Sequence, residues 1–465
     1  MVERISVIGL GKLGASMAAC FAYRGFEVIG VDISPKVVDA VNSGKAPVQE
    51  TGLDDLISAN KERIRATLSH EEAVLNSDIS FVIVPTPSDE RGAFSLQYAA
   101  WAYKEIGKAL AKKNGYHNVV LTSTVLPGST RQVLMPVLEK ESGKKAGKDF
   151  GVCYSPEFIA LGSVIRDFLN PDFTLIGELD ERCGEQLEQL YSKVVENGAP
   201  SARMSIENAE LTKIAVNTFV TTKITFANML AEICEKIPGG NVDVVTKALG
   251  MDSRIGHKYL KGALGYGGPC FPRDNIALSF IAKELGVSAE LAKITDSMNR
   301  SIVGKVVEKV KKIANQGSTV AVLGLAYKPF SHVTEESQSI QIASALSKSG
   351  YRVVGYDPLA GEMALSDLHG QIVVLESAKR CLQQAEVVLI TTPDPEFTKL
   401  KPEDFKNEFS KVTVIDFWRI LKGILEDVPY VRYIPFGCSE DDQANTKRIR
   451  EIWHFAKEEA LKTVR

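Results

Sequence analysis

The sequence predicts an α/β fold in which two Rossmann-like domains are joined by a central helical domain with a long helix. An apolar strand runs into a glycine-rich turn near residue 9, and a similar strand and turn recur near residue 320. Between them, residues 205–237 contain neither glycine nor proline. A chain of 465 residues is also too long for one hydrophobic core. We therefore expect three domains, with bounds 1–203, 204–312 and 313–465.

The first strand and turn, ISVIGLGKLG, carry Gly9, Gly11 and Gly14 and lead into a helix-like stretch. In this G-x-G-x-x-G pattern, the first glycine allows a tight turn and the second lets the backbone approach a pyrophosphate. The third lets the helix pack on the strand. The next strand, FEVIGVD, ends at Asp32, whose carboxylate suits a ribose 2′-hydroxyl and repels the extra phosphate of NADP. NAD is the predicted cofactor.

Three further apolar runs end in small hydroxyl residues and proline, as parallel strands do when their carboxyl ends face a ligand crevice. These runs are residues 79–88, 118–129 and 149–158. Thr86, Thr124 and Glu157 stand at or near the ends of these runs. We expect them on the rim of the crevice, where Thr86 and Thr124 join the cofactor-binding residues.

The long helix follows a linker near residues 194–204. Lys213 and Asn217 stand four positions apart on it and therefore project from one face. A lysine on a helix is ordinarily a solvated surface charge. The apolar residues that surround Lys213 in sequence leave a partly buried ammonium open as the alternative.

The segment GYGGPCFPRD holds a single thiol, Cys270, in a tight loop. Structural cysteines are usually packed among apolar side chains, whereas a reactive thiolate needs positive or dipolar surroundings and access to substrate. Gly267 and Gly268 let backbone amides approach an anion, and Arg273 adds positive charge. Asp274 lies four residues beyond the thiol. This setting indicates a nucleophile.

The last third of the chain repeats the pattern of the first strands and turn. VAVLGLAYKP echoes the first strand and turn, and GYRVVGYD echoes GFEVIGVD position by position, so that Asp357 matches Asp32. This repeat predicts a second Rossmann-like domain. Its turn has one glycine in place of three and carries Lys328. We therefore expect a phosphate-bearing ligand other than a dinucleotide there, with Lys328 as a point charge.

Composition excludes several other classes of protein. The formal net charge of -3 provides no basic surplus for a nucleic-acid backbone, and no apolar run is long enough for a membrane span. The seven cysteines are odd in number and form no CxxC pair, and the six histidines show no ligand spacing. We expect a cytoplasmic protein without disulfides, metal, nucleic-acid partner or membrane partner.

Together these motifs resemble the UDP-glucose/GDP-mannose dehydrogenase family over nearly the whole chain. The stretches that carry the resemblance are GLGKLG, VPTPS, STVLPGS, SPEF, ELTKIAVNTF, SRIGHKYLKGALGYGGPCFPRD and VLGLAYKP. The resemblance implies an NAD-dependent, four-electron oxidation of the C6 hydroxyl of a nucleotide sugar to a carboxylate. A thiohemiacetal and a thioester would form in turn on Cys270. The long helix would build a homodimer or a higher homo-oligomer.

By this resemblance, Lys213 stabilises negative charge on the C6 oxygen and Asn217 assists it. Asp274 and Thr124, with a water, handle protons, and Glu157 acts in hydrolysis or positioning. The first general base stays open among these residues. The residues implied in substrate binding are Glu157, Lys213, Asn217, Arg254 from a neighbouring subunit, Tyr259, Lys261, Gly267 and Lys328.

Three positions depart from the family pattern. Glu335 stands where many members have an arginine that reaches the NAD phosphates, and Leu161 replaces a common glutamate. Arg419, in DFWR, is displaced by one residue from the usual DGR. UDP-glucose is the expected substrate because RIGHKYLKGALGYGG is most similar to the UDP-glucose enzymes. GDP-mannose is the alternative, because STVLPGS and residues 142–152 are similar to the GDP-mannose enzymes.

Two other functions compete with this interpretation. A two-electron 3-hydroxyacid dehydrogenase of the 6-phosphogluconate type also has a Rossmann domain and a helix with a lysine and an asparagine. It needs neither a thiol nor a third domain. A non-catalytic NAD-binding scaffold would be expected to lose the reactive set, whereas Lys213, Asn217, Cys270 and Asp274 are all present.

Overall fold

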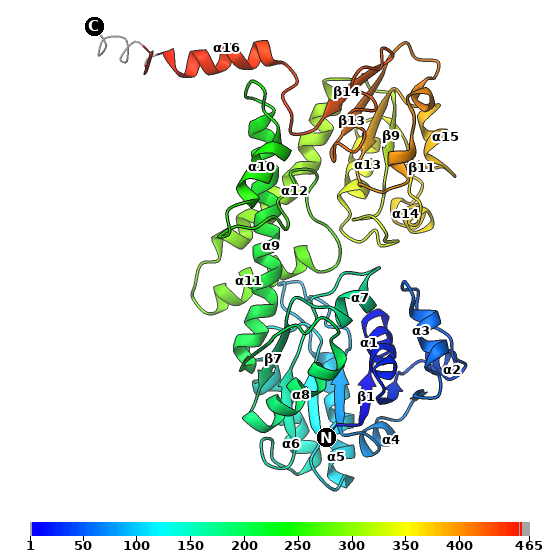
Figure 1. Cartoon of the computed structure of the whole chain (residues 1–465), viewed down its shortest axis with the longest axis vertical. Helices are drawn as coiled ribbons and strands as arrows, with labels where there is room; N and C mark the ends of the chain where they lie inside the picture. The colour runs from blue at the N-terminus through cyan, green and yellow to red at the C-terminus, as the bar shows by residue number, and fades with distance from the viewer. Residues whose placement is uncertain (1, 455, 458–465) are drawn as a thin grey trace. The chain divides into compact units, whose positions relative to one another are not determined.

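A computed structural model of the chain describes residues 2–454 and 456–457 (Figure 1). The chain forms two compact units: unit 1 is Met1–Val216 with Phe280–Ser288, and unit 2 is Asn217–Ser279 with Ala289–Arg465. Each unit contains one sheet, and long helices occupy the sequence between the two sheets. The predicted α/β fold, with two parallel-sheet domains and a central helical region, is confirmed. The three domain bounds stay a prediction.

The sheet of unit 1 has the order β3-β2-β1-β4-β5-β6-β7-β8, and all pairs are parallel except β6 with β7. Its strands are β1 (Arg4–Ile8), β2 (Glu27–Val31), β3 (Ile64–Thr67), β4 (Ile79–Val82), β5 (Asn118–Leu121), β6 (Gly151–Tyr154), β7 (Thr174–Glu178) and β8 (Ser201–Ser205). The strand order reverses at β1, which pairs with both β2 and β4. Ligands of such sheets bind outside the carboxyl ends of the strands at this switch point.

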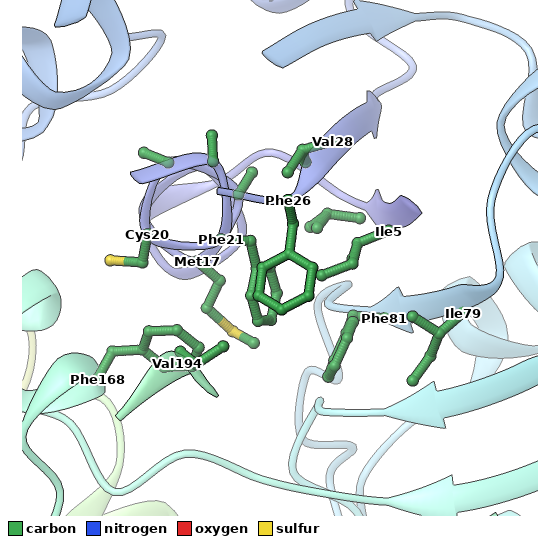
Figure 2. Close-up of a cluster of buried hydrophobic side chains, with 14 of the residues drawn as sticks. Ile5, Met17, Cys20, Phe21, Phe26, Val28, Ile79, Phe81, Phe168 and Val194 are labelled. Atoms are coloured by element: carbon green, nitrogen blue, oxygen red, sulfur yellow. The ribbon is translucent and has the colours of Figure 1, made fainter. Parts of the chain in front are cut away.

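Helices cover both faces of this sheet. They are α1 (Lys12–Tyr23), α2 (Pro35–Asn42), α3 (Leu53–Ala59), α4 (His70–Leu75), α5 (Gln97–Lys112), the π-helix η1 (Ser129–Leu134), α6 (Met135–Ser142), α7 (Val164–Leu169) and α8 (Glu181–Val194). On one face, Phe21 of α1 packs on Phe81 of β4, with ring centroids 4.9 Å apart, and on Phe168 of α7 (Figure 2). This apolar contact anchors α1 and so places its N-terminus beside the end of β1.

The sheet of unit 2 has the order β11-β10-β9-β12-β13-β14, with every pair parallel. Its strands are β9 (Thr319–Leu323), β10 (Arg352–Tyr356), β11 (Val373–Val374), β12 (Val387–Ile390), β13 (Val412–Asp416) and β14 (Val431–Pro435). The predicted repeat is also seen in corresponding hydrogen bonds of the two units. Asp357 Oδ2 accepts from the backbone N–H of Leu325 at 2.7 Å, as Asp32 Oδ2 accepts from that of Leu10 at 2.9 Å.

Helices α9 (Ile206–Cys234) and α11 (Phe271–Glu284) each contain residues of both units. Helix α9, predicted over 205–237, ends three residues earlier because Pro238 and Gly239 follow it. The other helices of unit 2 are α10 (Val242–Gly250), α12 (Glu290–Lys311), α13 (Gln338–Lys348), α14 (Gly361–Leu368), α15 (Ala378–Leu382), η2 (Phe397–Lys399), η3 (Pro402–Phe405) and α16 (Asp442–Ile452). Within the described residues, no helix has the length and apolar character needed to cross a membrane.

Candidate active site

The glycine-rich turn of unit 1 has the geometry that its sequence predicts. Gly9 has φ +95°, and a Cβ added there would lie 2.2 Å from the carbonyl oxygen of Ile83. A Cβ on Gly14 would lie 1.9 Å from the carbonyl oxygen of Gly9. At Gly11, by contrast, a Cβ would meet nothing within 4 Å. The first and third glycines are therefore needed for packing, and the second leaves open space in front of α1.

This open space fits the pyrophosphate of NAD. Gly11 is the N-cap residue of α1, and no side chain caps the helix. The first-turn N–H groups of a helix bind phosphate oxygens, and the helix dipole favours the negative charge. Asp32, at the end of β2, is oriented by two backbone N–H groups, because Leu10 donates to Oδ2 and Ser34 to Oδ1, each at 2.9 Å. The predicted ribose-binding carboxylate is therefore held in place.

The loops that follow β4 and β5 are bonded to each other. The Thr86 hydroxyl donates to the carbonyl of Thr124 at 2.8 Å. Ser123 Oγ donates to the carbonyl of Val84 at 2.7 Å and accepts from its N–H at 2.9 Å. The structure thus brings together the two threonines that the sequence predicts for the rim of the crevice, beyond the ends of β4, which pairs with β1, and β5, which pairs with β4.

One residue that the sequence reasoning missed supports this rim. Glu210 of α9 is fully buried, and its carboxylate accepts from the backbone N–H groups of Gly128 at 2.6 Å and Thr130 at 2.9 Å. Burial raises the pKa of this carboxyl, and these hydrogen bonds oppose the rise. The pair of bonds ties the loop beyond Thr124 to α9. The sequence feature that could have indicated Glu210 is a carboxylate three positions before Lys213 in an apolar helix.

Lys213 and Glu157 lie next to each other. The Lys213 ammonium donates to the backbone carbonyl of Glu157 at 2.6 Å and stands 4.6 Å from the ring centroid of Phe158. Only 8% of the lysine is exposed, so it is a buried ammonium and not a solvated surface charge. Burial raises the pKa of Glu157 to about 7, although Lys213 and the Tyr191 hydroxyl, which donates to Oε1 at 3.3 Å, act to lower it. A carboxyl that titrates near neutrality suits proton transfer.

Cys270 lies in unit 2 and is exposed, whereas the other six cysteines of the chain are buried. It stands one residue before α11, and its carbonyl accepts the helical bond from the N–H of Asp274 at 2.9 Å. The thiol is therefore carried at the positive end of a helix, where the dipole favours negative charge. This position agrees with the nucleophile that the loop sequence predicts.

Asn217 and Asp274 form a buried pair, and Asp274 stands four residues beyond Cys270 in the chain. Asn217 Nδ2 donates to Asp274 Oδ2 at 2.6 Å, and Arg273 Nε lies 3.6 Å from Asp274 Oδ1. The exposed fractions of Asn217 and Asp274 are 8% and 1%. Asn217, one turn beyond Lys213 on α9, therefore fixes the carboxylate in the first turn of α11. The structure brings Asn217, Asp274 and Cys270 together.

The loop before Cys270 packs closely on the turn that follows β9. A Cβ on Gly267 would lie 2.4 Å from the carbonyl oxygen of Glu336. Gly268 has φ +80°, and its added Cβ would lie 2.6 Å from the ring of Tyr327. Lys328, the predicted phosphate contact, has its Nζ 5.7 Å from the centroid of that same ring. The cysteine loop and the Lys328 turn are thus neighbours.

Three predicted substrate residues are placed on the surface between α10 and α11. Arg254 is paired with Asp252 at 2.6 Å, and its side chain is 86% exposed. Tyr259 is half exposed and has φ +63°, and Lys261 is exposed. Their roles in substrate binding stay predictions.

Arg419, one of the departures from the family pattern, has a structural partner. Its Nε and Nη2 donate to the two carboxylate oxygens of Asp243 on α10, at 2.7 and 2.9 Å. Its Nη1 donates to the carbonyls of Phe417 and Phe436. The side chain thus joins the segment after β13 to α10. Glu335, another departure, has an exposed side chain, and its carbonyl accepts from the N–H of Gly268 at 3.0 Å.

Three models of the UDP-glucose/GDP-mannose dehydrogenase family match the chain. The NAD binding domain matches residues 3–195, the central domain residues 207–301 and the UDP binding domain residues 321–423. These matches follow the same order along the chain as the two sheets and the helical region between them. The NAD prediction is confirmed by the first match.

Individual relatives cover most of the chain. The UDP-glucose 6-dehydrogenase of Haloferax volcanii is 36% identical over 403 residues, which are 86% of this chain and 93% of the relative. The GDP-mannose 6-dehydrogenase of Azotobacter vinelandii is 35% identical over 412 residues, covering 85% and 93%. The solved structure of a UDP-glucose dehydrogenase from Pyrobaculum islandicum has a TM-score of 0.85 at 31% identity, covering 94% of this chain and 98% of that chain.

Proposed function

Because the chain belongs to the UDP-glucose/GDP-mannose dehydrogenase family, we propose that it oxidises the C6 hydroxyl of UDP-glucose to a carboxylate, with two molecules of NAD consumed in succession. The observation that carries the proposal is the exposed thiol of Cys270 at the N-terminus of α11, backed by the buried Asn217–Asp274 pair. A two-electron dehydrogenase has no use for such a thiol.

UDP-glucose is preferred to other nucleotide sugars on two grounds. The stretch RIGHKYLKGALGYGG resembles the UDP-glucose enzymes, and the relatives from Haloferax volcanii and Pyrobaculum islandicum are UDP-glucose dehydrogenases. GDP-mannose is the second candidate, because the Azotobacter vinelandii relative is nearly as similar. A substrate panel decides between them.

In the first oxidation, bound NAD supplies the hydride acceptor. As the C6–H bond breaks, the hydroxyl loses its proton and negative charge develops on the C6 oxygen. The Lys213 ammonium stabilises that charge, and its burial strengthens the electrostatic effect. The bond to the Glu157 carbonyl and the contact with Phe158 fix the direction of the ammonium. The product of this step is an aldehyde.

The thiol keeps the aldehyde on the enzyme. The Cys270 thiolate attacks the carbonyl carbon, a C–S bond forms, and the carbonyl electron pair moves to oxygen, which takes a proton; the result is a thiohemiacetal. The carbon still carries one hydrogen, which leaves as the second hydride while the hydroxyl proton is lost. A thioester to Cys270 remains.

Hydrolysis releases the product. Water attacks the thioester carbon, its proton passes to the Glu157 carboxylate, and the C–S bond breaks so that Cys270 leaves as thiolate. Per sugar, these steps consume two NAD and one water and yield two NADH, one carboxylate and three protons. Asp274, held by Asn217, is the second carboxylate available for proton transfer.

The experiment is an assay for NADH across UDP-glucose, UDP-galactose, UDP-N-acetylglucosamine and GDP-mannose. We expect turnover with UDP-glucose and two NADH per sugar. Cys270→Ser should lower carboxylate formation by about a hundredfold or more, because a serine hydroxyl is far harder to ionise than a thiol. Cys438→Ser, at a buried cysteine, is the matched control and should keep both the rate and the ratio.

Three outcomes contradict the proposal in different ways. Turnover with GDP-mannose alone overturns the substrate. One NADH per sugar, or full activity of Cys270→Ser, overturns the covalent route. NADH formation with none of the sugars, while NAD still binds, favours the non-catalytic scaffold.

A further inference from the structure

We propose that three buried amide side chains, Asn228, Asn299 and Gln338, are positioning residues that fix the backbone of residues 263–266 and so hold the Cys270 thiol in its place. They come from α9, α12 and α13, and their exposed fractions are 4%, 5% and 5%. The inference rests on the proposed function, in which Cys270 is the nucleophile.

Two of the amides each form two hydrogen bonds with the loop backbone, one as donor and one as acceptor. Asn228 Oδ1 accepts from the N–H of Ala263 at 2.8 Å, and its Nδ2 donates to the carbonyl of Leu264 at 3.3 Å. Asn299 Oδ1 accepts from the N–H of Tyr266 at 2.9 Å, and its Nδ2 donates to the carbonyl of the same residue at 3.0 Å. Asn299 therefore pairs with Tyr266 as a neighbouring strand would.

Gln338 completes the set. Its Oε1 accepts from the N–H of Gly265 at 2.8 Å, and its Nε2 donates to the carbonyl of Asn299 at 2.8 Å. A Cβ on Gly265 would lie 1.9 Å from Asn299 Oδ1 and 2.4 Å from Gln338 Nε2. The loop backbone therefore lies directly against two of the amides, and only glycine fits between them.

These bonds replace the secondary structure that the loop lacks. Residues 261–267 form neither helix nor strand, yet most of them are buried. A buried backbone N–H without a hydrogen-bond partner costs free energy. The amides therefore determine which backbone conformation of this loop is stable. Tyr266 carries the constraint toward the thiol, because its ring packs edge-on against Phe271, the residue after Cys270, with centroids 6.1 Å apart.

Gln338 also connects two regions of different role. It is the first residue of α13 and lies inside the range that matches the UDP binding domain. The Glu335 carbonyl, from the same segment, accepts from the N–H of Gly268. The placement of Cys270 thus depends on the domain that receives the nucleotide as well as on the helices of the central region.

Two variants test the role of the amides. Asn299→Asp keeps the acceptor for the Tyr266 N–H and loses the donor to its carbonyl. Gln338→Met keeps the length of the side chain and removes both bonds, and it decides the question if the first variant does not fold. Asn445→Asp is the matched control, since Asn445 is also 4% exposed and donates to the Glu235 carbonyl at 3.0 Å, away from the loop.

The first readout is the rate at which iodoacetamide alkylates Cys270 in the folded enzyme, followed by peptide mass spectrometry. We expect the two loop variants to differ from wild type by about fivefold or more, and the control by less than about twofold. The second readout is single-turnover NADH formation. Relative to wild type, the factor by which the second, thiol-dependent phase slows should be about ten times the factor for the first phase. Small displacements of a nucleophile strongly reduce the rate of its attack.

Unchanged alkylation in both variants overturns the inference. An equal slowing of the two NADH phases also overturns it, because a loss of folded enzyme affects both phases alike. If wild-type enzyme forms no NADH with any nucleotide sugar, the proposed function fails, and the alkylation rates still decide whether the amides position the thiol.

Discussion

At the scale of single residues, one cysteine differs from the others in its exposure to solvent. Burial raises the pKa of Cys20 and Cys234, and it raises that of Cys381 to about 12, which keeps these thiols neutral and unreactive. Cys270 instead lies exposed at a helix N-terminus. Access and the helix dipole, rather than the presence of a thiol, distinguish the proposed nucleophile.

Glu157 gives a pH prediction at the same scale. Burial raises its pKa from 4.5 to about 7, and the carboxylate is the form that accepts a proton from water. We expect thioester hydrolysis to accelerate as pH rises, with a midpoint near 7. Stopped-flow decay of the acyl-enzyme across pH measures this rate. Glu157→Gln should lose the midpoint, and a variant with the wild-type profile would exclude Glu157 as the base.

The same shift has a consequence for stability. Since the folded-state pKa is raised, the stabilisation from the neutral Glu157 is full below about 4.5 and is lost as pH rises through 7. The melting temperature of wild type relative to Glu157→Gln should therefore fall across this window. A constant difference would mean that Glu157 ionises in the folded protein as it does in the unfolded chain.

At the scale of elements, four polar residues of α9 lie in one row along the helix. These residues are Glu210, Lys213, Asn217 and Thr221, at spacings of three or four. The first two bond loops of unit 1, and the last two both bond the start of α11. Thr221 receives the side-chain amide of Asn275 on α11 at 2.9 Å. Within unit 1 this row of α9 holds the rim loop and the buried ammonium, and within unit 2 it holds the first turn of α11.

The turn before α1 offers a matched pair of substitutions. In Gly14→Ala the new methyl group would lie 1.9 Å from a backbone oxygen, so unit 1 must distort. In Gly11→Ala it enters open space, so the fold should persist while the methyl group occupies the place of the pyrophosphate. We expect Gly14→Ala to lower the melting temperature and Gly11→Ala to weaken NAD binding about tenfold or more at an unchanged melting temperature.

Calorimetric titration with NAD and thermal denaturation measure the two effects. If Gly11→Ala bound NAD as tightly as wild type, the open space would not be the pyrophosphate site. If Gly14→Ala melted like wild type, the contact between α1 and the end of β1 would not limit the substitution.

At the scale of the whole molecule, the parts that could be predicted are those written in local patterns. The two strand-and-turn repeats give both sheets, and the run without glycine or proline gives α9, because periodicity and turn chemistry act within short segments. The glycines, Asp32, Lys213, Asn217 and Cys270 belong to such segments.

The supporting contacts could not be predicted in this way. Asn299 bonds Tyr266 across 33 positions, Gln338 bonds Gly265 across 73, and Arg419 bonds Asp243 across 176. Which buried amide meets which backbone N–H depends on the packing of distant elements, and a single sequence carries no local signal for it. The residues that support Cys270 therefore appear only in the folded structure.

The covalent route through Cys270 is tested most directly by trapping the intermediate. Glu157→Gln is mixed with UDP-glucose and NAD, quenched in acid and digested, and the Cys270 peptide is examined by mass spectrometry. We expect a mass increase on Cys270 equal to the UDP-glucuronyl group, and none when NAD is omitted. If that enzyme forms two NADH per sugar while the Cys270 peptide stays unmodified at every quench time, the thioester route is contradicted.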